Sequence, residues 1–130
     1  MSPLDTVKSF YAALGRGDVA AVVALLDDPL AWTEAEGFPY HAGTWNSPQA
    51  VVDGLLAPLA RDWDGFSARA DSFVSEGDEV VAFGAYGGAS RATGRVLAAP
   101  FAHRWRVTGG RIDRFVQYTD TALVQAATRA

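Results

Sequence analysis

Residues 100–120 read PFAHRWRVTGGRIDRFVQYTD, and this stretch decides the class of fold. Two runs rich in aromatic and β-branched residues flank a Thr-Gly-Gly turn at 108–110, which predicts antiparallel strands over 95–108 and 111–119. Side chains alternate between the two faces of a strand. The first strand therefore places on one face Phe101, His103, Trp105 and Val107, and on the other face Ala102, Arg104 and Arg106.

The second of these strands is expected to carry Val116, Tyr118 and Asp120 on one face, although a bulge could shift that register. Counted outward from the turn, one such offset lets His103 and Asp120 converge at the mouth or floor of a pocket. Asp120 also precedes a helix-like run over 122–127, where an aspartate is a good N-terminal cap. The same carboxylate therefore has two interpretations, a helix cap or a group that moves a proton.

The rest of the chain divides into a helical first half and a sheet-forming second half. Tight turns join neighbouring strands of the second half, which predicts an antiparallel meander. The expected elements are helices over 2–14, 18–29 and from 47, strands over 30–36, 66–75 and 79–87, and a final helix from 121. Helices followed by a long antiparallel sheet indicate the α+β class.

We therefore expect a single domain over residues 1–130 that folds as a cone-shaped α+β barrel. Its N-terminal helices would pack in a strongly curved, mainly antiparallel sheet, and its interior would be a pocket for a small molecule.

Composition excludes several classes of function. The chain has 49% hydrophobic and 20% charged residues, which is typical of an ordinary globular domain. There is no cysteine and there are only two histidines, so thiolate sites and all-histidine zinc sites are excluded. The net charge of −4 argues against nucleic acid as a partner. The sequence shows neither a membrane-spanning run nor a secretion signal, so a cytoplasmic location and no membrane contact are expected.

The motifs FYAAL…GD, YHAGTW, PFAHRWRVTGGRI and RFVQYTDTA together resemble the SnoaL-like family of the nuclear-transport-factor-like and ketosteroid-isomerase-like superfamily. The likeness covers nearly the whole chain and implies a cystatin-like α+β fold. In SnoaL-like polyketide cyclases a late aspartate acts as acid and base, with a histidine on the preceding strand nearby. The resemblance thus implies that Asp120 and His103 are the catalytic residues.

The chemistry of this pair also makes sense from the residues alone. A carboxylate surrounded by Tyr118, Trp105 and other apolar groups loses hydration, so its pKa is expected to rise. Such a group can take a proton from a carbon next to a carbonyl, and His103 could orient it or donate to the oxyanion. The alternative for His103 is a hydrogen-bonded core histidine.

Aromatic residues spread over helix, strand and loop suit a pocket for a flat or cyclic ligand. The candidate ligand contacts are Tyr11, Trp32, Tyr40, Trp45, Trp105 and Tyr118, each of which could instead be a core residue. Glu34 and Glu36 share the expected face of Trp32. The isomerase branch of the superfamily places a base near the end of this strand, but the sequence leaves open which glutamate would match. His41 lies in a loop and is expected to be exposed.

The leading hypothesis is a pocket protein that binds a small hydrophobic carbonyl compound and catalyses proton transfer, as in cyclisation, isomerisation or dehydration. No cofactor and no metal are expected. The alternatives are a non-catalytic ligand-binding or dimerisation module and an enzyme similar to epoxide hydrolases. We also expect a homodimer packed through the outer sheet face, which the alternation predicts to carry Arg104, Arg106, Phe115 and Gln117.

Overall fold

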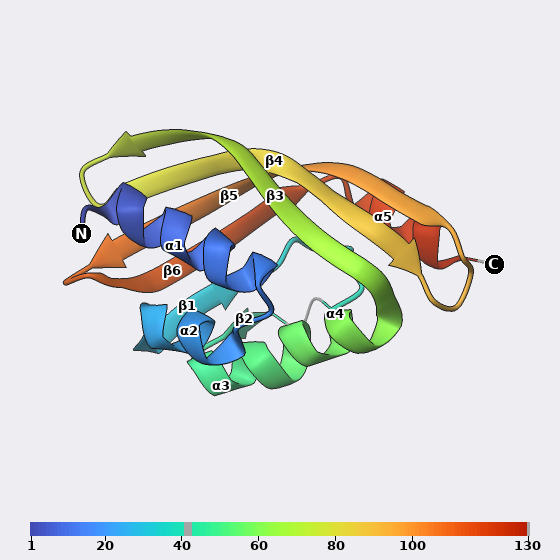
Figure 1. Cartoon of the computed structure of the whole chain (residues 1–130), viewed down its shortest axis with the longest axis horizontal. Coiled ribbons are helices and arrows are strands. Elements are labelled where there is room, and N and C mark those ends of the chain that lie inside the picture. Colours follow the sequence, from blue (N-terminus) through green and yellow to red (C-terminus); the bar gives the residue numbers. More distant parts are fainter. Residues whose placement is uncertain (41–42, 130) are drawn as a thin grey trace.

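The structure is a computed structural model that describes residues 1–40 and 43–129 (Figure 1). The chain begins with two helices and two strands, α1 (Pro3–Gly15), α2 (Val19–Leu25), β1 (Leu26–Thr33) and β2 (Thr44–Trp45). Helical turns follow without a break, namely α3 (Pro48–Val51), the π-helical η1 (Val52–Leu56) and α4 (Ala57–Asp62). The remaining elements are β3 (Trp63–Glu76), β4 (Glu79–Ser90), β5 (Val96–Thr108), β6 (Arg111–Thr119) and α5 (Thr121–Thr128).

The strands of the described residues form one six-stranded sheet in the order β2-β1-β6-β5-β4-β3. Strand β1 runs parallel to β6, and all other neighbours are antiparallel. In Figure 1 the long curved strands β3 to β6 form the upper layer, α1 packs against them, and α3 and α4 lie at the bottom of the view. The α+β class and the strongly curved sheet around the helices are therefore confirmed. The sheet stays open, because β2 and β3 are its two edges.

Two boundaries in the first half differ from the prediction. The helix expected over 18–29 ends at Leu25, and the extended backbone of β1 begins at Leu26. Leu26 pairs with Ile112 of β6 and is buried there, so tertiary pairing overrides the helical pattern of this run. The helix from Ser47 contains the π-helical turn over 52–56, which the apolar stripe of the sequence does not reveal.

A bulge in the β5–β6 hairpin reverses the predicted faces of β6. Arg106 pairs with Arg114 but Val107 pairs with Ile112, so Asp113 is an extra residue on β6. After this point the alternation changes phase, and the residues that face the interior are Phe115 and Gln117. The predictions that these two lie on the outer face and that Tyr118 faces the pocket are therefore wrong. Tyr118 is 54% exposed.

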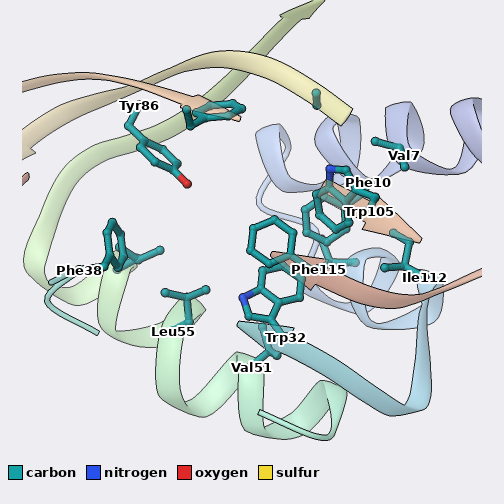
Figure 2. Close-up of a cluster of buried hydrophobic side chains, with 14 of the residues drawn as sticks. Val7, Phe10, Trp32, Phe38, Val51, Leu55, Tyr86, Trp105, Ile112 and Phe115 are labelled. Atoms are coloured by element: carbon teal, nitrogen blue, oxygen red, sulfur yellow. The ribbon is translucent and has the colours of Figure 1, made fainter. Parts of the chain in front are cut away.

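The interior faces of β5 and β6 form the base of an aromatic core. On this face His103 of β5 lies directly beside Gln117 of β6. As predicted, alternate residues of β5 point inward, and Phe101, His103, Trp105 and Val107 are all buried. Figure 2 shows Trp32, Phe115, Trp105 and Phe10 gathered at one end of this core. The ring centroids of Trp32 and Phe115 lie 3.9 Å apart in a stacked arrangement. Tyr86 and Phe38 lie apart from this cluster in Figure 2.

Candidate functional site

A cavity of about 930 Å³ lies between the curved sheet and the helices. Its walls come from α1, the end of β1, the helical turns over 52–62 and the inner faces of β3 to β6. Most of the lining is apolar and aromatic. The polar side chains that line it and are buried or nearly so are Tyr11, Glu34, Tyr86, His103 and Gln117.

Glu34 follows directly after β1 and points into this aromatic interior. Glu34 is only 3% exposed, and its Oε1 accepts a hydrogen bond of 3.2 Å from Nε1 of Trp32. Burial raises the pKa of Glu34 to about 7, because the ionised carboxylate loses hydration, and the Trp32 hydrogen bond only partly opposes this. At neutral pH the carboxyl group therefore exchanges readily between its protonated and ionised forms.

His103 occupies the centre of the cavity floor on β5, between two tyrosine hydroxyls. Its Nδ1 lies 2.5 Å from the hydroxyl of Tyr11 on α1, and its Nε2 lies 2.5 Å from the hydroxyl of Tyr86 on β4. The imidazole stacks on Phe101 with 3.8 Å between ring centroids. Burial lowers the pKa of His103 to about 3, so the ring is neutral at physiological pH.

Further hydrogen bonds extend this arrangement in both directions. Nε1 of Trp105 donates to the Tyr11 hydroxyl at 3.1 Å, and Nε2 of Gln117 donates to the Tyr86 hydroxyl at 2.8 Å. The side-chain oxygen of Gln117 in turn accepts from the backbone N–H of Ala35 at 2.9 Å. Burial raises the pKa of both tyrosines, so both hydroxyls keep their protons. A continuous buried network thus links α1 to the segment that carries Glu34.

Comparison with known proteins agrees with this architecture. The SnoaL-like domain matches residues 7–115. The chain belongs to the SnoaL-like domain family. The resemblance predicted from the sequence motifs is therefore confirmed.

Solved structures extend the likeness over the whole chain. An NTF2-like protein from Burkholderia thailandensis E264 is 38% identical, with coverage of 100% of this chain and 99% of that chain and a TM-score of 0.96. An NTF2-like protein of unknown function from Burkholderia pseudomallei K96243 is 26% identical, with full coverage of both chains and a TM-score of 0.90. A protein with a ketosteroid isomerase-like fold from Catenulispora acidiphila DSM 44928 shares the fold at 20% identity, with a TM-score of 0.82 and coverage of 98% and 94%. No curated protein matches the chain.

In this SnoaL-like domain the predicted ligand contacts divide into two groups. Tyr11, Trp32 and Trp105 line the cavity together with His103. Trp45 is half-buried outside the cavity lining, with its indole so close to Gly54 that a Cβ there would lie 2.9 Å from Nε1. Tyr40 lines a separate hollow of about 570 Å³, where it donates to Asp62 at 2.9 Å. Tyr118 is on the outer face of the sheet, because the bulge at Asp113 shifts the alternation of β6.

The structure does not bring Asp120 to His103. Asp120 is exposed, is not among the residues that line the cavity, and caps α5 through a hydrogen bond of 3.3 Å from the backbone N–H of Leu123 to Oδ1. The capping interpretation is the one that the structure shows. Because the strand β6 ends at Thr119, Asp120 belongs to the start of the helix and lies beyond the inward-facing positions of the strand.

Replacement of Asp120 by asparagine should leave the free energy of unfolding nearly unchanged, because asparagine caps a helix about as well as aspartate. Replacement by alanine should lower that free energy by about 1 kcal/mol, the usual contribution of a capping side chain. Urea denaturation of both variants measures the difference. A folded Asp120→Asn variant that loses activity toward a substrate would instead support the catalytic role that the family resemblance implies.

Two features of the network were not predicted from the sequence. Tyr86 was not recognised as a site residue, and Gln117 was expected to face outward. Alternation along β4, in which Val80, Ala82 and Tyr86 are buried, is a signal that could have placed Tyr86 inside. Glu36, the other glutamate left open, is exposed. His41 lies outside the residues that the structure describes. Within the described ranges, no group of three His, Asp or Glu side chains is arranged to hold a metal ion, and no helix is long and apolar enough to cross a membrane.

Proposed function

We propose that this SnoaL-like domain binds a flat hydrophobic carbonyl compound and that Glu34 transfers a proton on it. The observation that carries this proposal is a buried carboxyl group with a pKa raised to about 7 in the wall of an aromatic cavity. A general base works best when its pKa lies near the working pH, because it is then both available and strong enough.

The ligand class follows from the lining. A volume of about 930 Å³ is large enough for a molecule of two or three fused rings. Phe10, Trp32, Phe38, Trp105 and Phe115 supply apolar surfaces for such rings. The buried polar groups of the lining are Glu34, His103 and the side chains around them, which suits a ligand with a single polar region. A carbonyl group adjacent to a C–H bond is the simplest such region on which a carboxylate can act.

The proposed reaction needs only groups of this chain. Ionised Glu34 removes a proton from the carbon next to the carbonyl, so the C–H bond breaks and its electron pair forms an enolate. Hydrogen-bond donors of the cavity stabilise the negative charge on oxygen. Protonated Glu34 then returns the proton to carbon. Isomerisation, cyclisation and dehydration of carbonyl compounds all begin with this first step.

Proton exchange on a model ketone tests the proposal. The methyl protons of 2-acetylnaphthalene in D₂O should be replaced by deuterium in proportion to the protein concentration, as followed by proton NMR. The rate should rise with pH and level off with a midpoint near 7, because only the ionised carboxylate of Glu34 accepts a proton. Binding of the ketone, seen as shifts of the Trp32 and Trp105 indole signals, without any exchange would make the chain a non-catalytic ligand-binding module.

The homodimer predicted from the sequence remains a proposal, with a different set of contacts. Phe83 and Tyr118 are 40% and 54% exposed, and both are paired across the sheet with Ala102 of β5, so they share the outer face. On that face Arg104 and Arg106 are paired with Glu79 and Asp113, at 2.7 Å and 2.9 Å, so the arginines are not free cations.

Sedimentation equilibrium at micromolar concentration should give a mass of two chains. A Phe83→Ser, Tyr118→Ser double variant should give the mass of one chain, because burial of this apolar area would drive association. Val96→Ser, at the far end of β5 and 77% exposed, is the matched control that should remain a dimer. A wild-type protein that sediments as a single chain would remove the dimer proposal.

A further inference from the structure

The hydrogen-bonded group Tyr11–His103–Tyr86 holds one more proton than its two internal hydrogen bonds use. A neutral imidazole carries one N–H, and the two hydroxyls carry one hydrogen each. The bonds at Nδ1 and Nε2 consume two of these three hydrogens. One imidazole nitrogen must donate to its tyrosine while the other accepts from its tyrosine. The tyrosine that accepts from the ring therefore has its own O–H left to donate elsewhere.

We propose that the spare donor is Tyr86, which gives its O–H hydrogen bond to the oxygen of the bound ligand, and that His103 and Gln117 are positioning residues that hold it for this purpose. In this arrangement Tyr11 donates to Nδ1, and Nε2–H donates to Tyr86. The hydrogen-bond assignment is a property of the free protein. Only the nature of the ligand rests on the proposed function.

The surroundings of the two tyrosines decide between them. The Tyr11 oxygen already accepts from Trp105 at 3.1 Å, and its ring also packs against the rings of Phe10, Phe73 and Phe101. A buried O–H donor that is left without an acceptor destabilises the protein. Donation from Tyr11 to Nδ1 avoids this cost.

Tyr86 lies where a spare O–H is useful. Its hydroxyl lies between His103 and Gln117, and both Tyr86 and Glu34 line the cavity. Gln117 links this hydroxyl to the Glu34 segment, because its amide nitrogen donates to Tyr86 and its oxygen accepts from the backbone N–H of Ala35, next to Glu34. Burial raises the pKa of Tyr86, and the charge of Glu34 adds to this effect. A negative charge there also favours the orientation in which the Tyr86 hydrogen points toward it.

Gln117 cannot accept that hydrogen. Its side-chain oxygen is occupied by the N–H of Ala35, which turns its amide nitrogen toward Tyr86 as a donor. With Nε2–H of His103 as a second donor, both acceptor positions of the Tyr86 oxygen are filled. The remaining O–H is then available to the carbonyl of a ligand in the cavity that both Tyr86 and Glu34 line. The same group would stabilise the enolate oxygen as Glu34 removes the proton.

The protonated nitrogen of His103 in the free protein is the first test. Nitrogen-15 NMR of the imidazole should show a proton on Nε2 and none on Nδ1, with no change between pH 5 and pH 8, because the ring stays neutral. A ring with the proton on Nδ1 would make Tyr11 the spare donor and overturn the proposal. This measurement needs neither a ligand nor activity, so its outcome is independent of Glu34.

The second test compares two probes of the same shape, 2-acetylnaphthalene and 2-isopropenylnaphthalene, which differ in a C=O against a C=CH₂ group. Wild type should bind the ketone about tenfold more tightly, the size expected for one hydrogen bond to a buried oxygen. The carbonyl stretching frequency of the bound ketone should be lower than in a hydrocarbon solvent. Tyr86→Phe should lose both effects, whereas Tyr40→Phe, whose hydroxyl lies outside this cavity, should keep them.

A folded Tyr86→Phe protein that retains the preference for the ketone would overturn the proposal, as would loss of the preference in Tyr11→Phe alone. If Tyr86→Phe does not fold, the NMR assignment in the wild type still decides. If the wild type binds the ketone more tightly than the hydrocarbon but the ketone does not exchange its protons, this result would count against Glu34 as a base. Tyr86 would remain the hydrogen-bond donor to the ligand.

Discussion

Glu34→Gln is expected to stop proton exchange on 2-acetylnaphthalene and, above pH 7, to make the protein more stable. Glutamine has nearly the same shape and keeps an oxygen for the 3.2 Å hydrogen bond from Trp32, but it cannot take up a proton. Loss of a general base lowers a rate by about 10²–10⁴-fold. The exchange experiment measures this loss directly, and Glu34 is the residue for which we expect the largest effect on activity.

The gain in stability follows from the direction of the pKa shift. In the unfolded chain the Glu34 carboxyl ionises near its ordinary value of 4.5, whereas in the folded protein burial raises its pKa to about 7. Between these values the folded state binds the proton and the unfolded state does not, so this group makes stability fall as pH rises. Above pH 7 the cost is on the order of 3 kcal/mol. Urea denaturation at pH 5 and pH 8 should show the variant gaining mainly at pH 8.

Glu36→Gln is the matched control, because Glu36 carries the same charge two residues away and is exposed. It should leave the exchange rate unchanged and change the free energy of unfolding by no more than about 0.5 kcal/mol, as is usual for a surface substitution. A Glu34→Gln protein that exchanges protons at the wild-type rate would remove Glu34 from the mechanism. Equal unfolding free energies for wild type and Glu34→Gln at pH 8 would show that the carboxyl group is not raised in pKa.

Trp32→Ala should cause the largest loss of stability. Trp32 is 3% exposed, and its indole stacks on Phe115 with 3.9 Å between centroids and donates its N–H to Glu34. Truncation of a buried aromatic side chain typically costs about 3–5 kcal/mol, because both the transfer of the ring from water and its packing are lost. Thermal and urea denaturation measure this cost. Ligand binding should weaken as well, since the same ring lines the cavity.

Trp45 is the natural comparison, because it pairs with Trp32 across β1 and β2. It is only half-buried and does not line the cavity, so Trp45→Ala should cost about 1–2 kcal/mol. Ligand-induced stabilisation should be unchanged in the Trp45 variant. If both tryptophans contributed equally to ligand binding, the cavity would extend beyond the boundary that its lining residues define.

The sequence determined those features that depend on local pattern. Alternation along 100–107 places His103 and Trp105 on the buried face of one strand, and the Thr-Gly-Gly turn sets the next strand antiparallel to it. Four helices begin after a residue whose side chain caps them, namely Ser2, Asp18, Ser47 and Asp120. Such features were predictable because a strand repeats every two residues and a cap acts on backbone groups within one turn.

The site itself was decided by tertiary structure. A single extra residue, Asp113, changes the phase of β6, so that Gln117 replaces Tyr118 beside His103. The same curvature and register leave Asp120 on the surface and bury Glu34. The family resemblance had implied a catalytic role for Asp120, and the sequence left open whether Glu34 or Glu36 would match the base of the isomerase branch. A carboxyl group acquires an unusual pKa only from what surrounds it in space, and for Glu34 that surrounding is the lining of the cavity, drawn from helices and strands throughout the chain.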